Sequence, residues 1–191
     1  MNHKANCPEK WWGISHPFIV KKSIQITKQA LRDSDSIGST NTLDSDLSGG
    51  QLDAFKHSYW MSLLVRDIKE RKALKLGIAH EKGNYKSFKK RIGKGEKTTH
   101  DKPGSDMDLW NNRIGIEIGK THKKDSRIIL QQAVIDSIKA GKMRILYKNK
   151  SGQYLNCEGE LIPQDSLSGK WENEKCLVPS NFIQEKQSPP N

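Results

Sequence analysis

QLDAFKHSYWMSLLVRDIKER, residues 51–71, is the stretch that decides the fold class. Its large apolar side chains recur at intervals of three and four, and Gly49-Gly50 precede them, so the pattern predicts one amphipathic helix over 51–71. Asp53, His57 and Trp60 fall at positions i, i+4 and i+7 of that helix and therefore share one face. The stretch thus predicts a core helix that also carries ionisable groups.

The sequence on either side predicts a chain made mainly of helices. Pro17 suits the first turn of a helix, Ser105 and Asp108 have the spacing of a capping box, and Gly141 follows the last residue of a helical pattern. Further helices are predicted over residues 17–32, 72–81, 105–120 and 126–140.

Two segments between these helices are predicted to be loops. Residues 33–50 are rich in Ser, Asp, Thr, Asn and Gly, and residues 82–103 combine several glycines with many Lys and Arg. The second segment is expected to be mobile, with a single helical turn at 85–89. Its positive charge is either solvated surface or a rim that draws an anionic substrate toward a polar cavity.

The last fifty residues have strand character. Residues 143–147 alternate apolar and polar side chains, 149–152 are turn residues, and 153–157 alternate again, which predicts a β-hairpin. The predicted fold class is therefore mainly α with a small C-terminal β-hairpin, α+β overall. The expected organisation is a helical domain over 1–142, a β-rich extension over 143–183 and a disordered tail over 184–191.

The three cysteines leave two interpretations open. A disulfide between Cys157 and Cys176 would close a loop of about twenty residues and would imply an oxidising compartment such as a periplasm. Two free thiols in a cytosolic protein are equally compatible with the sequence, and Cys7 stays unpaired in both cases.

Composition limits the class of protein. The chain has 191 residues, 34% hydrophobic and 29% charged, with a net charge of +11. No apolar run is long enough for a membrane-spanning helix, and no signal peptide is visible at the beginning. The positive charge favours an anionic partner, such as nucleic acid, a phospholipid surface or a cell-envelope precursor.

Three polar clusters within the predicted helices indicate a shared site. Each offers the side chains that bind divalent metals or move protons, together with amides that orient a ligand. The expected catalytic residues are His57, His80, Glu81 and Asp108. The expected metal ligands are Asp53, His57, His80, Asp106 and Asp108, and the expected substrate-binding residues are Lys56, Trp60, Asn111 and Asn112.

Each of these residues also has a purely structural interpretation. Asp53 can cap a helix, and His57 can be a core histidine bonded to Asp53 or Asp108. Trp60 can belong to the core, and the two asparagines can bridge helix ends. The spacing is neither that of a zinc protease nor that of an EF-hand loop, so the metal would be Ca, Mg or Zn without a diagnostic motif.

The order of these clusters resembles a bacterial domain family of unknown function that is associated with secreted and polymorphic-toxin proteins. The resemblance rests on Trp11-Trp12 with His16-Pro17, the Asp53–Trp60 segment, Ala79-His80-Glu81, and the Met107–Gly115 segment. It covers about residues 8–119. Lys56 stands where that family is expected to have Arg, which keeps the charge and loses the bidentate fork. The resemblance implies site positions and a toxin-like context, and no reaction.

These observations support three hypotheses about function. The first is a secreted antibacterial effector, delivered to the periplasm of a target cell, that hydrolyses a phosphate ester of a lipid or envelope substrate. A divalent metal or a His-carboxylate pair would activate water, and an acidic immunity protein would be its partner. The alternatives are a nuclease toxin that uses the same site and a non-catalytic binding module with a structural polar cluster.

Overall fold

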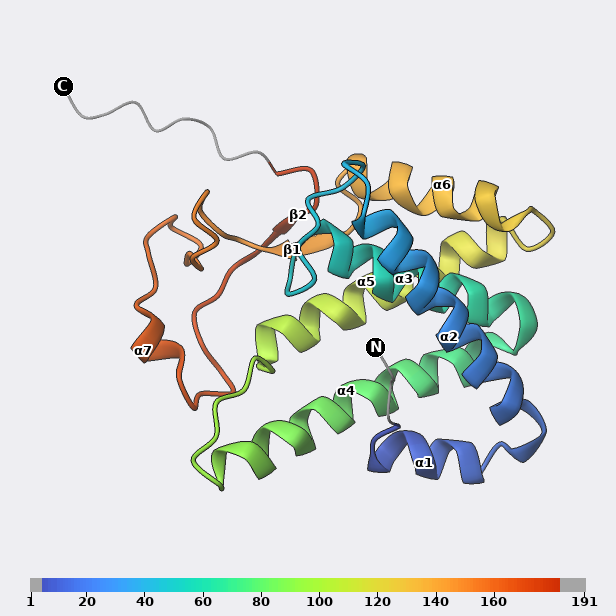
Figure 1. Ribbon diagram of the computed structural model, residues 1–191, viewed down its shortest axis with the longest axis horizontal. Coiled ribbons are helices and arrows are strands. Elements are labelled where there is room, and N and C mark those ends of the chain that lie inside the picture. Colours follow the sequence, from blue (N-terminus) through green and yellow to red (C-terminus); the bar gives the residue numbers. More distant parts are fainter. Residues whose placement is uncertain (1–4, 183–191) are drawn as a thin grey trace.

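The structure is a computed structural model, and it describes residues 5–182. Helices make up most of the fold, and a small antiparallel sheet lies near its C-terminal end (Figure 1). The predicted fold class, mainly α with a small β appendage, is confirmed. The elements are α1 (Cys7–Ile14), α2 (Pro17–Gly38), α3 (Gln51–Asp67), α4 (Glu70–Ile92), α5 (Lys102–Thr121), α6 (Arg127–Lys139), β1 (Arg144–Leu146), α7 (Gln164–Leu167) and β2 (Leu177–Pro179).

Helix α3 is the centre of the fold and packs against α2, α4, α5 and α6 (Figure 1). The helix predicted over 51–71 is confirmed, but it ends at Asp67. Instead of one apolar stripe, every residue from Leu52 to Val65 except Lys56 is buried. Because α3 is covered on nearly all sides, its polar side chains must find partners inside the protein.

Helix α5 lies unusually close to α3. A Cβ atom on Gly115 would lie 2.1 Å from the carbonyl oxygen of Ser58, and one on Gly119 would lie 2.4 Å from that of Ser62. Only glycine permits this approach, since any side chain there would push the two helices apart. The close contact brings the polar residues in the first half of α5 next to those in the first half of α3.

The N-terminal part has more helix than predicted. Helix α1 was not expected, although Asn6 and Glu9 form a capping box at its beginning. Helix α2 begins at Pro17 as predicted, but it continues to Gly38, so the loop predicted over 33–50 is wrong at its beginning. Asp33 accepts a hydrogen bond of 2.9 Å from the Tyr59 hydroxyl, which keeps this last part of α2 against the core.

The basic segment 82–103 is mostly helical, which corrects the prediction of a mobile loop. Helix α4 continues without interruption to Ile92, because Ala79, Gly83 and Phe88 are buried on one side while the Lys and Arg side chains project outward. Helix α5 then begins at Lys102. Its N-cap is Asp101, whose side chain accepts a hydrogen bond from the Gly104 amide, so the capping box predicted at Ser105 is wrong.

The predicted β-hairpin has the wrong partner strand. Strand β1 pairs antiparallel with β2, with Ile145 opposite Val178, whereas the predicted return strand contributes two isolated bridges, Lys148–Tyr154 and Leu155–Leu161. A disulfide between Cys157 and Cys176 holds the intervening loop against the beginning of β2. Of the two pairing states left open by the sequence, the structure has the disulfide. The tail predicted over 184–191 lies outside the described residues.

Two polar contacts attach the C-terminal segment to α5. Lys175 forms a buried ion pair of 2.6 Å with the N-cap residue Asp101. Asn111 donates to the Arg144 carbonyl and accepts from the Arg144 amide, both at 2.9 Å, and so pairs with β1 as a neighbouring strand would. These contacts fix the half of α5 that carries Asp108. Among the described residues, no helix combines the length and the apolar character needed to cross a bilayer.

Candidate functional site

Asp53, His57 and Asp108 form a compact group where α3 meets α5. Oxygen and nitrogen atoms of the three side chains lie within 4.8 Å of one another. The Nε2 atom of His57 is 3.8 Å from Asp53 Oδ1 and 3.4 Å from Asp108 Oδ2. The imidazole is 6% exposed and the two carboxylates 10% and 13%. Two carboxylates and one imidazole in this arrangement can hold a metal ion.

Helix periodicity explains why these groups converge. Asp53 and His57 are one turn apart on α3, and Asp108 comes from the face of α5 that also carries Gly115 two turns later. Lys56, on the same side of α3, makes a close ion pair with Asp53 and is 29% exposed. It therefore places a positive charge at the outer edge of the group.

Several buried polar atoms around this group have no hydrogen-bond partner. Among the described residues they are His57 Nδ1, Asp108 Oδ1, Glu81 Oε1 and both side-chain polar atoms of Asn112, and a nitrogen of Arg66 elsewhere in the molecule is the sixth. An unpaired buried polar group is costly, so such atoms are few in folded proteins and one site here holds most of them. The concentration of unpaired acceptors and donors indicates a place where buried water or a ligand supplies the partners.

Burial controls the charge of the two central residues. It lowers the pKa of His57 well below the usual range, and the positive charge of Lys56 acts in the same direction. It raises the pKa of Asp108 well above the usual range, and the carboxylates of Asp53 and Glu81 add to that effect. His57 is therefore a neutral imidazole at pH 7, which is the form that binds a metal or accepts a proton.

The surroundings also shift the pKa values of Lys56 and Glu81. Burial opposes the charge of Lys56, but the adjacent Asp53 carboxylate outweighs burial and raises the pKa of the amine. Burial raises the pKa of Glu81, although Asn84 donates a hydrogen bond of 3.1 Å to its carboxylate. Three carboxylates, Asp53, Glu81 and Asp108, thus share one lysine in a poorly hydrated region, and a bound cation would relieve their mutual repulsion.

His80 extends the site on the side of α4. Its Nδ1 atom is 2.7 Å from Glu9 Oε1 of α1, and its ring centre lies 5.9 Å from that of His57. The ring of Trp60 meets His80 edge-on at 5.6 Å and donates its own N–H to Thr27. Trp60, predicted to bind substrate, therefore supports the His80 ring from the core.

The structure places the remaining predicted residues in three different settings. Asn112 lies beside the His57 imidazole without hydrogen-bond geometry, and its amide belongs to the unpaired group. Asn111 points to the other side and uses its amide on Arg144. Asp106 is exposed and pairs with Lys102, so the structure does not bring it to the metal-ligand group.

Sequence reasoning missed Glu9. This residue is buried, caps α1 through the Asn6 amide and holds His80 at the same time. The spacing Asn6-x-x-Glu9 before an apolar pair of tryptophans is a capping-box signal that could have shown the helix. It could not have shown the contact with His80, which joins residues 71 positions apart.

The fold and the site together define a helical protein with a buried histidine-carboxylate centre able to hold a cation. The chain belongs to the family described as "Domain of unknown function (DUF6973)", whose model matches residues 10–142, more than half of the sequence. The match includes every predicted site residue. No curated protein and no solved structure matches the chain.

Proposed function

We propose that this protein is a hydrolase in which Asp53, His57 and Asp108 bind a divalent cation that activates water against a phosphate ester. The substrate we propose is a lipid or another component of the cell envelope. The proposal extends the family assignment, which by itself names no reaction.

The observation that carries the proposal is the convergence of unpaired atoms. Two carboxylates and a neutral imidazole come within 4.8 Å of one another, and further acceptors from Glu81 and Asn112 face the same region. A structural polar network would pair these atoms with one another. A cation with its bound waters would give partners to the carboxylate oxygens and to the imidazole nitrogen that faces them.

The surrounding charges suit hydrolysis. A bound divalent ion would lower the pKa of its water, and we assign the proton that is released to Glu81 or to the His80–Glu9 pair, whose imidazole centre lies 5.9 Å from that of His57. Lys56, at the outer edge, would stabilise the negative charge that develops on phosphate. Attack of water on phosphorus forms one P–O bond and breaks another, and the leaving oxygen takes a proton.

The biological setting that we propose is that of a secreted antibacterial effector. The resemblance to toxin-associated domains, the +11 charge and the Cys157–Cys176 disulfide support it, since a disulfide persists in an oxidising compartment. Action in the periplasm of a target cell and neutralisation by an acidic immunity protein belong to this proposal.

The test begins with metal-free protein and the soluble diester bis(p-nitrophenyl) phosphate. We expect activity to return on addition of Mg²⁺, Ca²⁺, Mn²⁺ or Zn²⁺, and His57→Ala and Asp108→Asn to lose at least a hundredfold in kcat. Asp106→Asn is the matched control, because Asp106 lies on the same helix outside the group and should keep wild-type activity. Full activity after metal removal, or in Asp108→Asn, would contradict the proposal.

A nuclease is the second candidate, because the outward side of α4 carries Lys82, Lys86, Lys89, Lys90 and Arg91. It is tested by incubating the same protein with DNA, RNA and phospholipid vesicles. The third candidate is a non-catalytic module. It requires that His57→Ala and Asp108→Asn change the melting temperature while no substrate is turned over by the wild type.

A further inference from the structure

We propose that the groove between α1 and α2 binds an acyl chain of an anionic glycerophospholipid, and that the corner formed by these two helices contacts the bilayer. This inference rests on the proposed function, since it names the substrate class of the same site.

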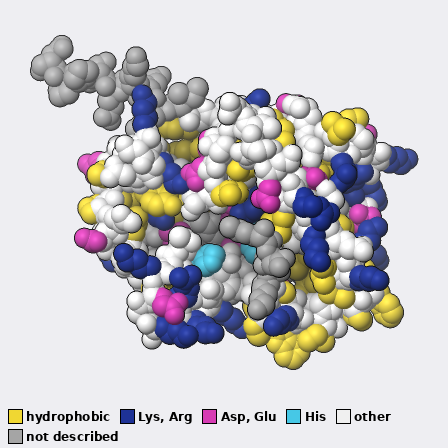
Figure 2. Space-filling view, in the orientation of Figure 1, with side chains coloured by type: hydrophobic (Ala, Val, Ile, Leu, Met, Phe, Trp, Pro, Cys, Tyr) yellow, Lys and Arg dark blue, Asp and Glu magenta, His cyan; other side chains and the backbone are white. Residues whose placement is uncertain are grey.

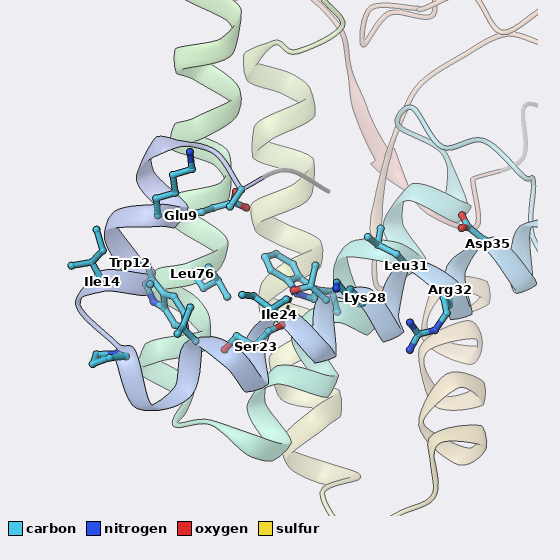
Figure 3. A pocket seen from close by; sticks show the side chains of 17 residues that line it. Glu9, Trp12, Ile14, Ser23, Ile24, Lys28, Leu31, Arg32, Asp35 and Leu76 are labelled. Atoms are coloured by element: carbon cyan, nitrogen blue, oxygen red, sulfur yellow. Dashed lines mark hydrogen bonds between the residues drawn. The ribbon is translucent and has the colours of Figure 1, made fainter. Parts of the chain in front are cut away.

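The groove is large and mostly apolar. Its volume is about 880 Å³, within the range of about 300–1,000 Å³ that is typical of small-molecule sites. Figure 3 shows Trp12 of α1 pointing toward Ile24 of α2, with Leu31 farther along α2, and Ile14 is a further lining residue from α1. Trp60 and Leu76 complete the apolar lining, and Lys10, Lys28 and Arg32 supply positive charges along it.

The groove borders the polar site. Glu9 and Trp60 line it, and the same two residues contact His80, through an atom separation of 2.7 Å and an edge-on ring contact. His80 in turn lies next to His57. A molecule with its polar part at the histidines and an apolar chain directed away from them would therefore enter the groove. This is the shape of an amphiphile and not that of a nucleotide.

The outer surface of the α1–α2 corner has the composition of a membrane-contacting surface. Trp11 and Ile14 are about two-thirds exposed, and Phe18 is fully exposed. Figure 2 shows hydrophobic side chains gathered over α1 and the beginning of α2, with Lys and Arg among them. Exposed Lys10, Lys21 and Lys28 belong to the same helices. Aromatic and aliphatic side chains beside lysines favour an anionic lipid surface.

The first experiment is co-sedimentation with vesicles of phosphatidylglycerol and phosphatidylcholine in equal parts, and with phosphatidylcholine alone. We expect binding to the anionic vesicles only, with an affinity that falls as salt is raised. Phe18→Asp, at a fully exposed position, should weaken it at least tenfold. Ile128→Asp, at a similarly exposed position on α6, is the control and should bind as the wild type does. Equal binding by Phe18→Asp and wild type would overturn the proposal.

The second experiment tests the groove with cis-parinaric acid, a fluorescent fatty acid. We expect saturable binding by the wild type and by Asp108→Asn, and at least tenfold weaker binding by Leu31→Trp, which fills the groove without adding charge. No saturable binding, or no effect of Leu31→Trp in a folded variant, would overturn the proposal. A third result would also overturn the proposal: a wild-type dimer in light scattering that Phe18→Asp converts to a monomer. The corner would then contact a second copy of the chain and not a bilayer.

The two proposals fail in different ways. Lipid binding without turnover of any phosphate ester would leave the acyl-chain site in place and end the proposed hydrolase. Turnover of the soluble diester without binding of vesicles or fatty acid would support the proposed hydrolase and end the proposed acyl-chain site.

Discussion

Asp108→Asn gives a quantitative test of how the site is charged. The change keeps the shape of the side chain and removes the carboxyl group whose pKa is raised by burial and by Asp53 and Glu81. In metal-free wild-type protein, the folded state holds this proton more tightly than the unfolded state. The free energy of unfolding contributed by Asp108 is therefore retained below pH 3.8 and is lost as pH rises through the folded-state pKa.

The magnitude follows from the linkage of one proton. Between the unfolded-state and the folded-state pKa, the stability of the wild type relative to Asp108→Asn should fall by up to about 1.4 kcal/mol per pH unit. For a chain of this size that corresponds to a change in melting temperature of roughly 3–6 °C per pH unit. Asp108→Asn should thus be the more stable protein at neutral pH when a chelator is present.

The assay is thermal unfolding by circular dichroism from pH 3.5 to 8, with and without a saturating divalent ion. Asp106→Asn, at an exposed position, should show no such pH-dependent difference. A difference between Asp108→Asn and wild type that stays constant with pH, or that makes the wild type more stable at neutral pH without metal, would refute the assignment of Asp108 as a buried carboxyl group with a raised pKa.

Three further predictions concern the framework that holds the site. Asn111→Ala should lower the free energy of unfolding by about 2–4 kcal/mol, since it leaves two backbone groups of Arg144 unpaired. Asn112→Ala removes an amide without partners and should cost less in the metal-free protein. Equal losses of stability in urea denaturation would contradict this. Gly115→Ala should destabilise the protein by about 1–3 kcal/mol and weaken metal binding, because the added Cβ pushes α5 away from Ser58. An unchanged metal affinity would show that the α3–α5 spacing does not control the site. Replacing Cys157 and Cys176 by serine should lower the free energy of thermal unfolding by roughly 3 kcal/mol. Metal binding should stay intact, because the disulfide lies outside residues 10–142, which match the family and contain the site. Loss of metal binding in the folded variant would contradict this.

The sequence was sufficient to predict the parts of the fold that depend on local periodicity. The helix at 51–71, the beginning of α2 at Pro17 and the helix capped by Ser126 follow from apolar spacing and capping residues, and the structure has all three. The second half of α4 was missed because its many Lys side chains conceal a narrow buried face around Phe88. The pairing of β1 with β2 was missed because it joins residues more than thirty positions apart and is fixed by a disulfide and by Asn111.

The residues of the site were likewise predictable only where local spacing brings them together. Asp53 and His57 share a helix face by spacing alone, so their proximity was predictable. The approach of Asp108 to His57 depends on Gly115 and Gly119 of α5, and the contact of His80 with Glu9 depends on how α1 packs on α4. Asp106 and Asp108 are two positions apart in the sequence, yet they point to opposite sides of α5, which is why only one of them joins the group.

The most direct test of the cation centre is a calorimetric titration of metal-free protein with Mg²⁺, Ca²⁺, Mn²⁺ and Zn²⁺ in turn. We predict that at least one of these ions binds with a stoichiometry of one per chain, that Asp108→Asn abolishes the binding, and that Asp106→Asn retains it. An absence of stoichiometric binding by all four ions, or binding that survives Asp108→Asn, would mean that Asp53, His57 and Asp108 do not form a metal site.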